Sequence, residues 1–145
     1  METLEKQYNI PYAFEAGLSV RNVYKTVTEE HELICMRLFV NNEKAGEIVL
    51  KLLKDGSTLE IDSLYIEKEH RCQGHGSKLL TVAEETALKR NVERVIIHPY
   101  SIEEDYMSDS ALKRYYMKRG FIPFRCKMVK PVNDRKMPHS IRRKN

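Results

Sequence analysis

The stretch over residues 59–88 constrains the fold of this chain most strongly, because a strand pattern changes there into a helix pattern within a few residues. Residues 59–66 are apolar, alternate over part of their length and are rich in strand-forming residues, which predicts a buried or half-buried strand. From Ser77 onward, apolar residues recur at spacings of three and four, as on one face of a helix: Leu79, Leu80, Ala83 and Ala87. The sequence therefore predicts a strand, a short turn and a helix.

The turn contains Gly74 and Gly76 on either side of His75, directly before the predicted helix. The start of a helix has backbone N–H groups without partners and a partial positive charge, and glycines let a pyrophosphate approach that backbone closely. The turn lacks both the Gly-Lys-Ser/Thr ending of nucleoside triphosphate loops and the third glycine of dinucleotide-binding loops. It predicts a different phosphate site, the alternative being a turn that only lets strand and helix pack.

Two segments together are similar to the GNAT acyltransferase superfamily. The run Arg71-Cys72-Gln73-Gly74-His75-Gly76 resembles its Arg/Gln-x-x-Gly-x-Gly/Ala motif, which binds the pyrophosphate of acetyl-CoA. The run Tyr116-Met117-Lys118-Arg119-Gly120-Phe121 resembles its Tyr-x-Lys-x-Gly-Phe signature. Each motif alone is weak, but the two stand in the family's order, and the resemblance covers roughly half of the chain, from residue 59 to residue 124.

The resemblance implies an N-acetyltransferase that uses acetyl-CoA as cosubstrate and acetylates a primary amine by direct attack in a ternary complex. It implies a cofactor-binding set composed of Leu64, Tyr65, Ile66, Arg71, Cys72, Gln73, Gly74, His75, Gly76 and Ser77. It implies no metal site, and the sequence does not identify the amine acceptor. The alternative function is a catalytically weak acyl-CoA-binding sensor or interaction module.

The resemblance also implies two catalytic residues. Tyr116 stands where the family places the acid that protonates the departing thiolate, whereas we assign the neighbouring Tyr115 to packing. Both tyrosines lie at helical spacing from Leu112, so Tyr116 can also be a core residue. Glu60 precedes Arg71 by the separation typical of the catalytic Glu of histone-acetylating members. Glu60 is therefore the candidate base, the alternatives being a solvent-facing strand residue or an ordered water as base.

Further polar residues fall near the expected acceptor. His98 follows a predicted strand and can relay a proton or serve as a hydrogen-bonded structural histidine. The acidic run Glu103-Glu104-Asp105 can attract a cationic amine or form an ordinary solvated loop. Cys72 has no role that the family requires.

The rest of the chain predicts an α/β (α+β) fold around a mixed, centrally splayed sheet of about six to seven strands with helices packed on both faces. Strands over residues 20–28, 31–40, 46–53 and 59–66 form an N-terminal antiparallel meander, 95–98 and 121–128 supply the other strands, and helices cover residues 77–90 and 109–119. The family's helices after its first strand have no room between Thr28 and His31. Either they are displaced into the first nineteen residues, with the first strand in residues 1–10, or they are lost.

Length and charge bound the remaining possibilities. With 145 residues, the chain is predicted to form one domain over residues 1–130, followed by a basic tail over residues 131–145. Residues 127–145 hold seven Lys or Arg against one Asp, so the net charge of +4 belongs to this end. We expect a solubilising tail rather than a nucleic-acid partner. Three cysteines without paired spacing, no membrane-length apolar stretch and no secretory opening predict a cytoplasmic protein, with a homodimer left open.

Overall fold

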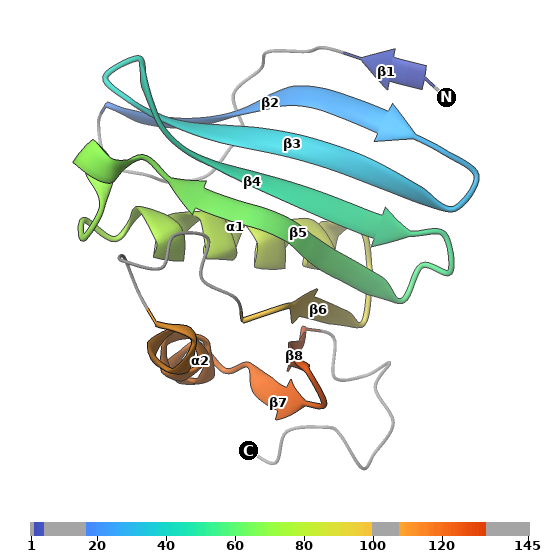
Figure 1. Ribbon diagram of the computed structural model, residues 1–145. Coiled ribbons are helices and arrows are strands. Elements are labelled where there is room, and N and C mark those ends of the chain that lie inside the picture. The colour runs from blue at the N-terminus through green and yellow to red at the C-terminus, as the bar shows by residue number, and fades with distance from the viewer. Residues whose placement is uncertain (1, 5–16, 100–107, 133–145) are drawn as a thin grey trace.

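The computed structural model describes residues 2–4, 17–99 and 108–132. They form one eight-stranded mixed sheet with strand order β1-β2-β3-β4-β5-β6-β8-β7 and two α-helices (Figure 1). The strands are β1 (Glu2–Leu4), β2 (Leu18–Val27), β3 (His31–Val40), β4 (Glu43–Leu53), β5 (Thr58–Ile66), β6 (Arg94–Ile97), β7 (Ile122–Phe124) and β8 (Lys127–Pro131). The helices are α1 (His75–Lys89) and α2 (Asp109–Lys118), and a short 3-10 helix, η1 (Lys68–His70), follows β5. The predicted α+β class with a mixed sheet is confirmed.

The predicted four-strand meander is confirmed in β2, β3, β4 and β5, which pair antiparallel in sequence order. The strand β3 has the predicted bounds, whereas β4 begins three residues earlier than predicted. The reason is a tight turn: Asn41 and Asn42 have φ angles of 49° and 69°. Two consecutive left-handed residues make the two-residue hairpin connection whose twist matches the flanking strands, and asparagine tolerates this conformation.

The N-terminal strand β1 pairs antiparallel with β2. A strand therefore lies within the first ten residues. This position was predicted by the alternative in which the family's helices are displaced into the first nineteen residues. Residues 5–16, into which those helices would be displaced, lie outside the described residues. The three-residue β1 also brings the sheet to eight strands instead of six or seven.

The crossover from β5 through α1 to β6 is parallel, which makes the sheet mixed, as predicted. The two strands pair only over Thr58–Ile61 and Arg94–Ile97, so residues 62–66 of β5 run on past the end of β6 (Figure 1). We call this divergence of β5 from β6 the split. It is the splayed centre that the sequence predicted.

The buried core lies on one face of the sheet, under α1. Leu50, Ile61 and Ile97 are side chains of this face, and they join one buried cluster with the apolar face of α1. Gly46 lets β4 approach the helix, because a β-carbon built there would lie 3.3 Å from Leu79 Cδ1. Successive strand residues alternate between the two faces, so Glu60 points to the opposite face.

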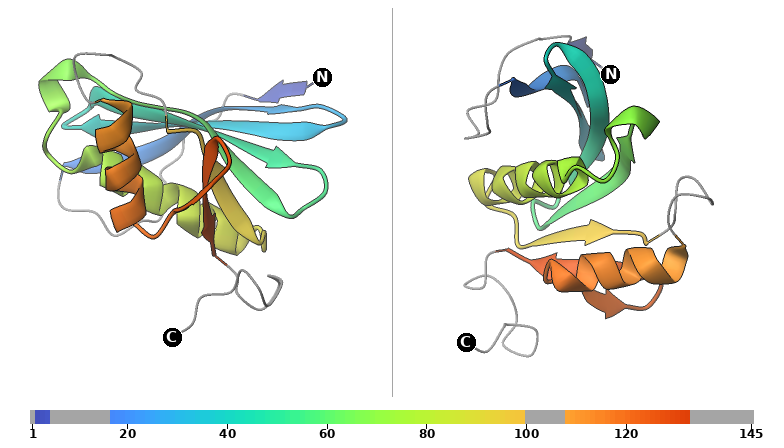
Figure 2. Two further views of the ribbon diagram at one scale, coloured as in Figure 1. Left: turned by 60° about the horizontal axis from the view of Figure 1, so that its bottom comes forward. Right: turned by 90° about the vertical axis from the view of Figure 1, so that its left-hand side faces the viewer.

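The helix α2 lies on the same face as α1. The side chain of Arg119, just after α2, donates to Thr81 Oγ1 at 3.2 Å and Glu84 Oε2 at 3.1 Å in α1, and Tyr116 joins the buried cluster. Figure 2 shows α1 along the sheet and α2 beside the strands of the C-terminal half. The described helices thus cover one of the two faces on which helices were predicted.

The C-terminal strand β8 extends the fold to Val132. Pro131 pairs with Arg94, and the Val132 N–H donates to the Glu93 carbonyl at 3.0 Å. Pro131, the first residue of the predicted basic tail, thus belongs to the sheet, and Lys130 before it is ion-paired with the half-buried Glu84 of α1. Residues 133–145, which hold most of the predicted tail, lie outside the described residues.

Of the described helices, neither has the length and apolar composition that crossing a membrane requires.

Candidate active site

The turn before α1 places a row of backbone N–H groups toward solvent at the helix start. Gly74 caps α1 with φ 81°, and Cys72 is also left-handed, with φ 62°. The first helical bond is donated by Lys78 N–H to the Gly74 carbonyl at 3.2 Å. Within the described ranges, the N–H groups of Gln73, Gly74, Gly76 and Ser77 donate to no protein acceptor. N–H groups without acceptors at a helix start suit an anion, so these groups, which we call the cradle, are the candidate for the phosphate site that the sequence predicted.

Two side chains at the cradle were not assigned to it from the sequence. A β-carbon built on Gly74 would lie 3.8 Å from Lys78 Nζ, so an ammonium group stands beside the cradle. The Tyr115 hydroxyl lies 2.8 Å from Ser77 Oγ, within hydrogen-bonding distance. The assignment of Tyr115 to packing is therefore incomplete, because its ring packs against the core while its hydroxyl reaches the cradle. Lys78 could have been assigned to the cradle from the sequence, because it lies one helical turn after Gly74. The Tyr115 contact was not, because it joins residues 38 positions apart.

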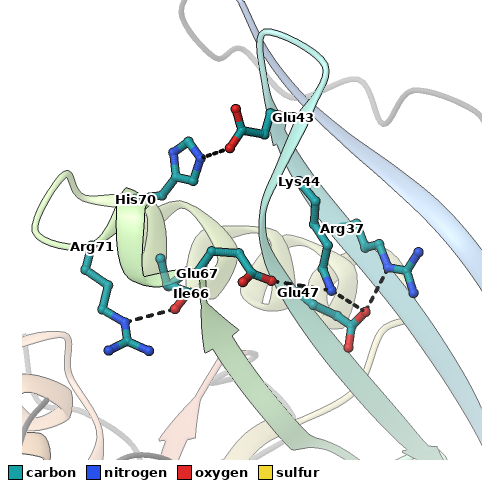
Figure 3. A network of polar contacts seen from close by, with 8 residues as sticks. All are labelled: Arg37, Glu43, Lys44, Glu47, Ile66, Glu67, His70 and Arg71. Carbon is teal, nitrogen blue, oxygen red and sulfur yellow. Dashed lines mark hydrogen bonds and ion pairs between the residues drawn. The ribbon is translucent and has the colours of Figure 1, made fainter. Parts of the chain in front are cut away.

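Arg71 ties the cradle to the end of β5. Its Nε donates to the Ile66 carbonyl at 3.0 Å, and its guanidinium carbon lies 5.6 Å from the centre of the Tyr65 ring. Figure 3 shows Arg71 reaching back to Ile66 from the far side of η1. Arg71, Tyr65 and Ile66, all predicted to bind the cofactor, are therefore brought together. Leu64 lies two residues before Ile66 on the same part of β5, residues 62–66, which pairs with β4 but has no partner in β6 and which we call the unpaired part of β5.

A chain of ion pairs holds the segment after β5 against the meander (Figure 3). Arg37 Nε donates to Glu47 Oε1 at 2.8 Å, and Lys44 Nζ lies 3.8 Å from Glu47 and 3.6 Å from Glu67. The chain crosses β3, β4 and the residue that precedes η1. Individual exposed pairs contribute little to stability, but together they orient the backbone that leads into the cradle.

Tyr116, the predicted acid, is buried in the core on the α1 face. Only 4% of the residue is exposed, and its ring centre lies 5.6 Å from that of Phe121 and 5.5 Å from that of Tyr115. Its carbonyl accepts the Arg119 and Phe121 N–H groups at the end of α2. The sequence alternative of a core residue thus describes the ring correctly. Tyr116 also belongs to the cluster that contains Ile61 and Ile97, the last paired residues before the split.

Glu60, the predicted base, lies beside His98 on the opposite face of the sheet. His98 Nε2 is 3.3 Å from Glu60 Oε1, and the two side chains are 39% and 26% exposed. Glu60 directly precedes Ile61, the last β5 residue that pairs with β6, and His98 directly follows β6, so the pair stands at the edge of the split. The sequence indicated both residues separately and did not pair them. The acidic run Glu103-Glu104-Asp105 lies outside the described residues, and no group of three or more described His, Cys, Asp or Glu side chains is placed to hold a metal ion.

A comparison of the sequence with models of protein families identifies the family of this chain. Residues 1–121 match the model of the acetyltransferase (GNAT) family. The chain belongs to this family. It is an acyltransferase, and acetyl-CoA is its cosubstrate.

Solved structures share the fold of this GNAT protein at low sequence identity. One, described as an acyl-CoA N-acyltransferase of Klebsiella pneumoniae, is 23% identical with a TM-score of 0.57, and the match covers 70% of this chain and 73% of that one. The PaiA N-acetyltransferase of Thermoplasma acidophilum, solved with coenzyme A, is 21% identical with a TM-score of 0.56 over 68% of this chain and 60% of its own. Gcn5 of Tetrahymena is 18% identical with a TM-score of 0.55 over 73% of this chain and 71% of its own. These likenesses establish the GNAT fold of the chain.

Proposed function

We propose that this GNAT protein is an N-acetyltransferase that transfers the acetyl group of acetyl-CoA to a primary amine by direct attack in a ternary complex. One observation carries the proposal. The cradle N–H groups, which have no acceptor among the described residues, lie where α1 begins, next to a strand that has diverged from its neighbour. A helix start suits a diphosphate, and an unpaired strand edge suits a ligand that carries amide groups.

In this proposal, the donor is bound by the backbone from Cys72 to Ser77, with Arg71 as a positive partner and Leu64, Tyr65 and Ile66 along the unpaired part of β5. Acetyl-CoA supplies an activated acetyl thioester. The residues fit such a ligand, because Gly74 leaves open space at the cradle apart from Lys78 Nζ, which is itself a cation suited to a phosphate. Holding the donor in one geometry lowers the entropic part of the barrier.

The two catalytic roles fall on opposite faces of the sheet. Tyr116, on the α1 face, donates a proton to the departing thiolate, and Glu60, on the other face, serves as the base for the attacking ammonium group, either directly or through a group that it contacts. Since Ile61 and Ile97 are the last paired residues, an acceptor amine reaches the α1 face through the split. A donor on one side and an acceptor on the other form a ternary complex without a covalent enzyme intermediate.

The test is release of CoA from acetyl-CoA in the presence of a panel of primary amines. Tyr116→Phe keeps the buried ring and removes the proton donor, so we expect kcat to fall about tenfold to a hundredfold. Tyr115→Phe is the matched control: it breaks the contact with Ser77 and is expected to raise KM for acetyl-CoA while kcat changes less than about threefold.

Two outcomes contradict the proposal. Tight acetyl-CoA binding without CoA release across the whole panel would favour a sensor or interaction module. An unchanged kcat in Tyr116→Phe, with turnover in the wild type, would remove Tyr116 from the acid role and leave the transferase intact.

A further inference from the structure

Glu60 and His98 are a carboxylate and an imidazole that the tertiary fold brings to one place. The Glu60 side chain comes from β5, and its strand partner in β6 is Ile96. His98 lies two residues after Ile96 and therefore projects from the same face, which explains the 3.3 Å between His98 Nε2 and Glu60 Oε1. Neither group is fully in solvent, since their side chains are 39% and 26% exposed.

The position of the pair relates it to the acceptor amine. The cradle and both helices occupy one face of the sheet, whereas Glu60 and His98 occupy the other face at the edge of the split. An amine that approaches the α1 face through the split passes this pair. The inference rests on the proposed function, because only an amine acceptor needs a proton removed there.

We propose that Glu60 and His98 act as one proton acceptor, in which the His98 imidazole takes the ammonium proton and the Glu60 carboxylate holds the ring and stabilises the imidazolium. One N–H bond of the ammonium breaks, one N–H bond forms on the imidazole, and the nitrogen keeps the electron pair with which it attacks. No oxidant or second reactant is required. A free imidazole titrates near pH 6.5 and a free carboxyl near pH 4.3, so imidazole is the better acceptor at neutral pH.

Charged groups around the pair affect how readily it takes a proton. Lys51 of β4 is the strand partner of Glu60, while Arg94 and Lys127 are on the pair's face in β6 and β8. These cations disfavour an imidazolium. Two described carboxylates of β5 offset them: Glu60, in ion-pair distance of the ring, and Asp62, two residues further along the strand. Removing the charge of Glu60, which contacts the ring, should therefore make His98 harder to protonate.

The chain supplies a matched control in a second histidine–carboxylate pair. His70 Nε2 lies 3.3 Å from Glu43 Oε1, the same separation as in the proposed pair, but Glu43 is 71% exposed. This pair joins η1 to the start of β4 (Figure 3) and includes neither Glu60 nor His98. His70→Gln thus removes an imidazole from a histidine–carboxylate contact of the same length, and it leaves Glu60 and His98 unchanged.

The first experiment follows the histidine ring protons of the full chain by NMR as a function of pH, without substrate. In Glu60→Gln, we expect the midpoint of the His98 titration to move to lower pH by at least half a unit, whereas the His70 midpoint stays in place. An unmoved His98 midpoint would overturn the pairing, whatever the catalytic result. Thermal melting of each variant, read by circular dichroism, identifies any that fail to fold, and Glu60→Asp then replaces Glu60→Gln.

The second experiment measures kcat/KM for the amine against pH. His98→Gln is expected to lower kcat/KM at pH 7 by about tenfold to a hundredfold and to displace the acid limb of the profile by at least one pH unit. Adding Glu60→Gln to His98→Gln should cost less than about threefold more, because the two residues act as one unit. His70→Gln should leave the acid limb where it is.

The outcomes separate the inference from the function on which it rests. An unshifted acid limb in His98→Gln, or fully additive losses in the double variant, would overturn the shared acceptor while amine acetylation stands. An absence of CoA release by the wild type with every amine would overturn the proposed function, and with it the acceptor role, even if the NMR titration shows the pair to be coupled.

Discussion

At the scale of single residues, the three cysteines differ in reactivity because of burial. Cys35 of β3 is fully buried, and burial together with the nearby Glu47 carboxylate raises the pKa of its thiol to about 11. Cys72 and Cys126 are exposed. Thiolates, not thiols, react with alkylating agents. At pH 8 we expect iodoacetamide to label Cys72 and Cys126 and to leave Cys35 unlabelled, as measured by peptide mass spectrometry. Rapid labelling of Cys35 in the folded protein would contradict this.

Glu32 of β3 makes the stability of the protein depend on pH. Burial of Glu32 favours its neutral form, but Arg90 contacts both carboxylate oxygens at 3.0 and 3.1 Å, and Lys25 lies at 3.4 Å. The net effect lowers the pKa of Glu32 below its usual 4.5. The stabilisation is therefore present above the unfolded-state value and is lost as pH falls through the lower, folded-state value.

We accordingly expect Arg90→Gln to lower the free energy of unfolding by about 1–2 kcal/mol at pH 7. The substitution removes the partly exposed guanidinium group and leaves the largely buried Glu32 carboxylate without this partner. The loss should shrink below pH 4, as the carboxyl group becomes neutral. Urea denaturation at both pH values checks this. Lys25→Gln, which removes a longer and singly contacted pair, is the control and should cost less. An Arg90→Gln loss that is equal at both pH values would show that packing and not charge is responsible.

At the scale of elements, β4, β5 and α1 approach one another closely at Gly46. A β-carbon there would lie 2.7 Å from Ile66 Cδ1 and 3.0 Å from the Tyr65 carbonyl oxygen. Gly46→Ala should therefore lower the free energy of unfolding by about 1–3 kcal/mol through overpacking, as measured by urea denaturation. It should also weaken acetyl-CoA binding, because Tyr65 and Ile66 form the unpaired part of β5.

Gly56→Ala is the matched control for this substitution. Gly56 has open space within 4 Å and a φ of 74°, so alanine there meets backbone strain alone, which costs about 1–2 kcal/mol. It lies in the turn before β5, at the opposite end of that strand from the cradle. If both variants bound acetyl-CoA equally, packing at Gly46 would not position the unpaired end of β5.

At the scale of the whole molecule, β8 connects β6 to the edge strand β7 and joins the sheet to α1. It pairs with β6 from Met128 to Pro131, and Lys130 reaches Glu84. We expect truncation after Val129 to lower the melting temperature by more than about 5 °C relative to truncation after Val132, because the first loses ladder pairs and a half-buried ion-pair partner. Equal melting temperatures, by circular dichroism, would show that the residues 130–132 do not contribute to the fold.

Local sequence was sufficient for most elements and for the cradle. The predicted bounds of β3 and the predicted start of α2 at Asp109 are confirmed, and both follow from features within a few residues. Ser108 caps α2, and the left-handed Asn91 follows α1. The glycines before α1 likewise act within one turn. Such features are readable because strand alternation, helical spacing and left-handed backbone are properties of neighbouring residues. The sequence by itself therefore determined the family, the order of elements and the position of the glycine turn that begins α1.

Only the tertiary structure decided which side chains meet. It placed the Tyr115 hydroxyl on Ser77 and the neighbouring Tyr116 ring in the core, joined His98 to Glu60, and tied Lys130 to Glu84. Adjacent residues of a helix point about 100° apart, and adjacent strand residues point to opposite faces. The assignment of one side chain to a site or to the core thus depends on helix rotation and strand register, which are set by contacts between distant parts of the chain.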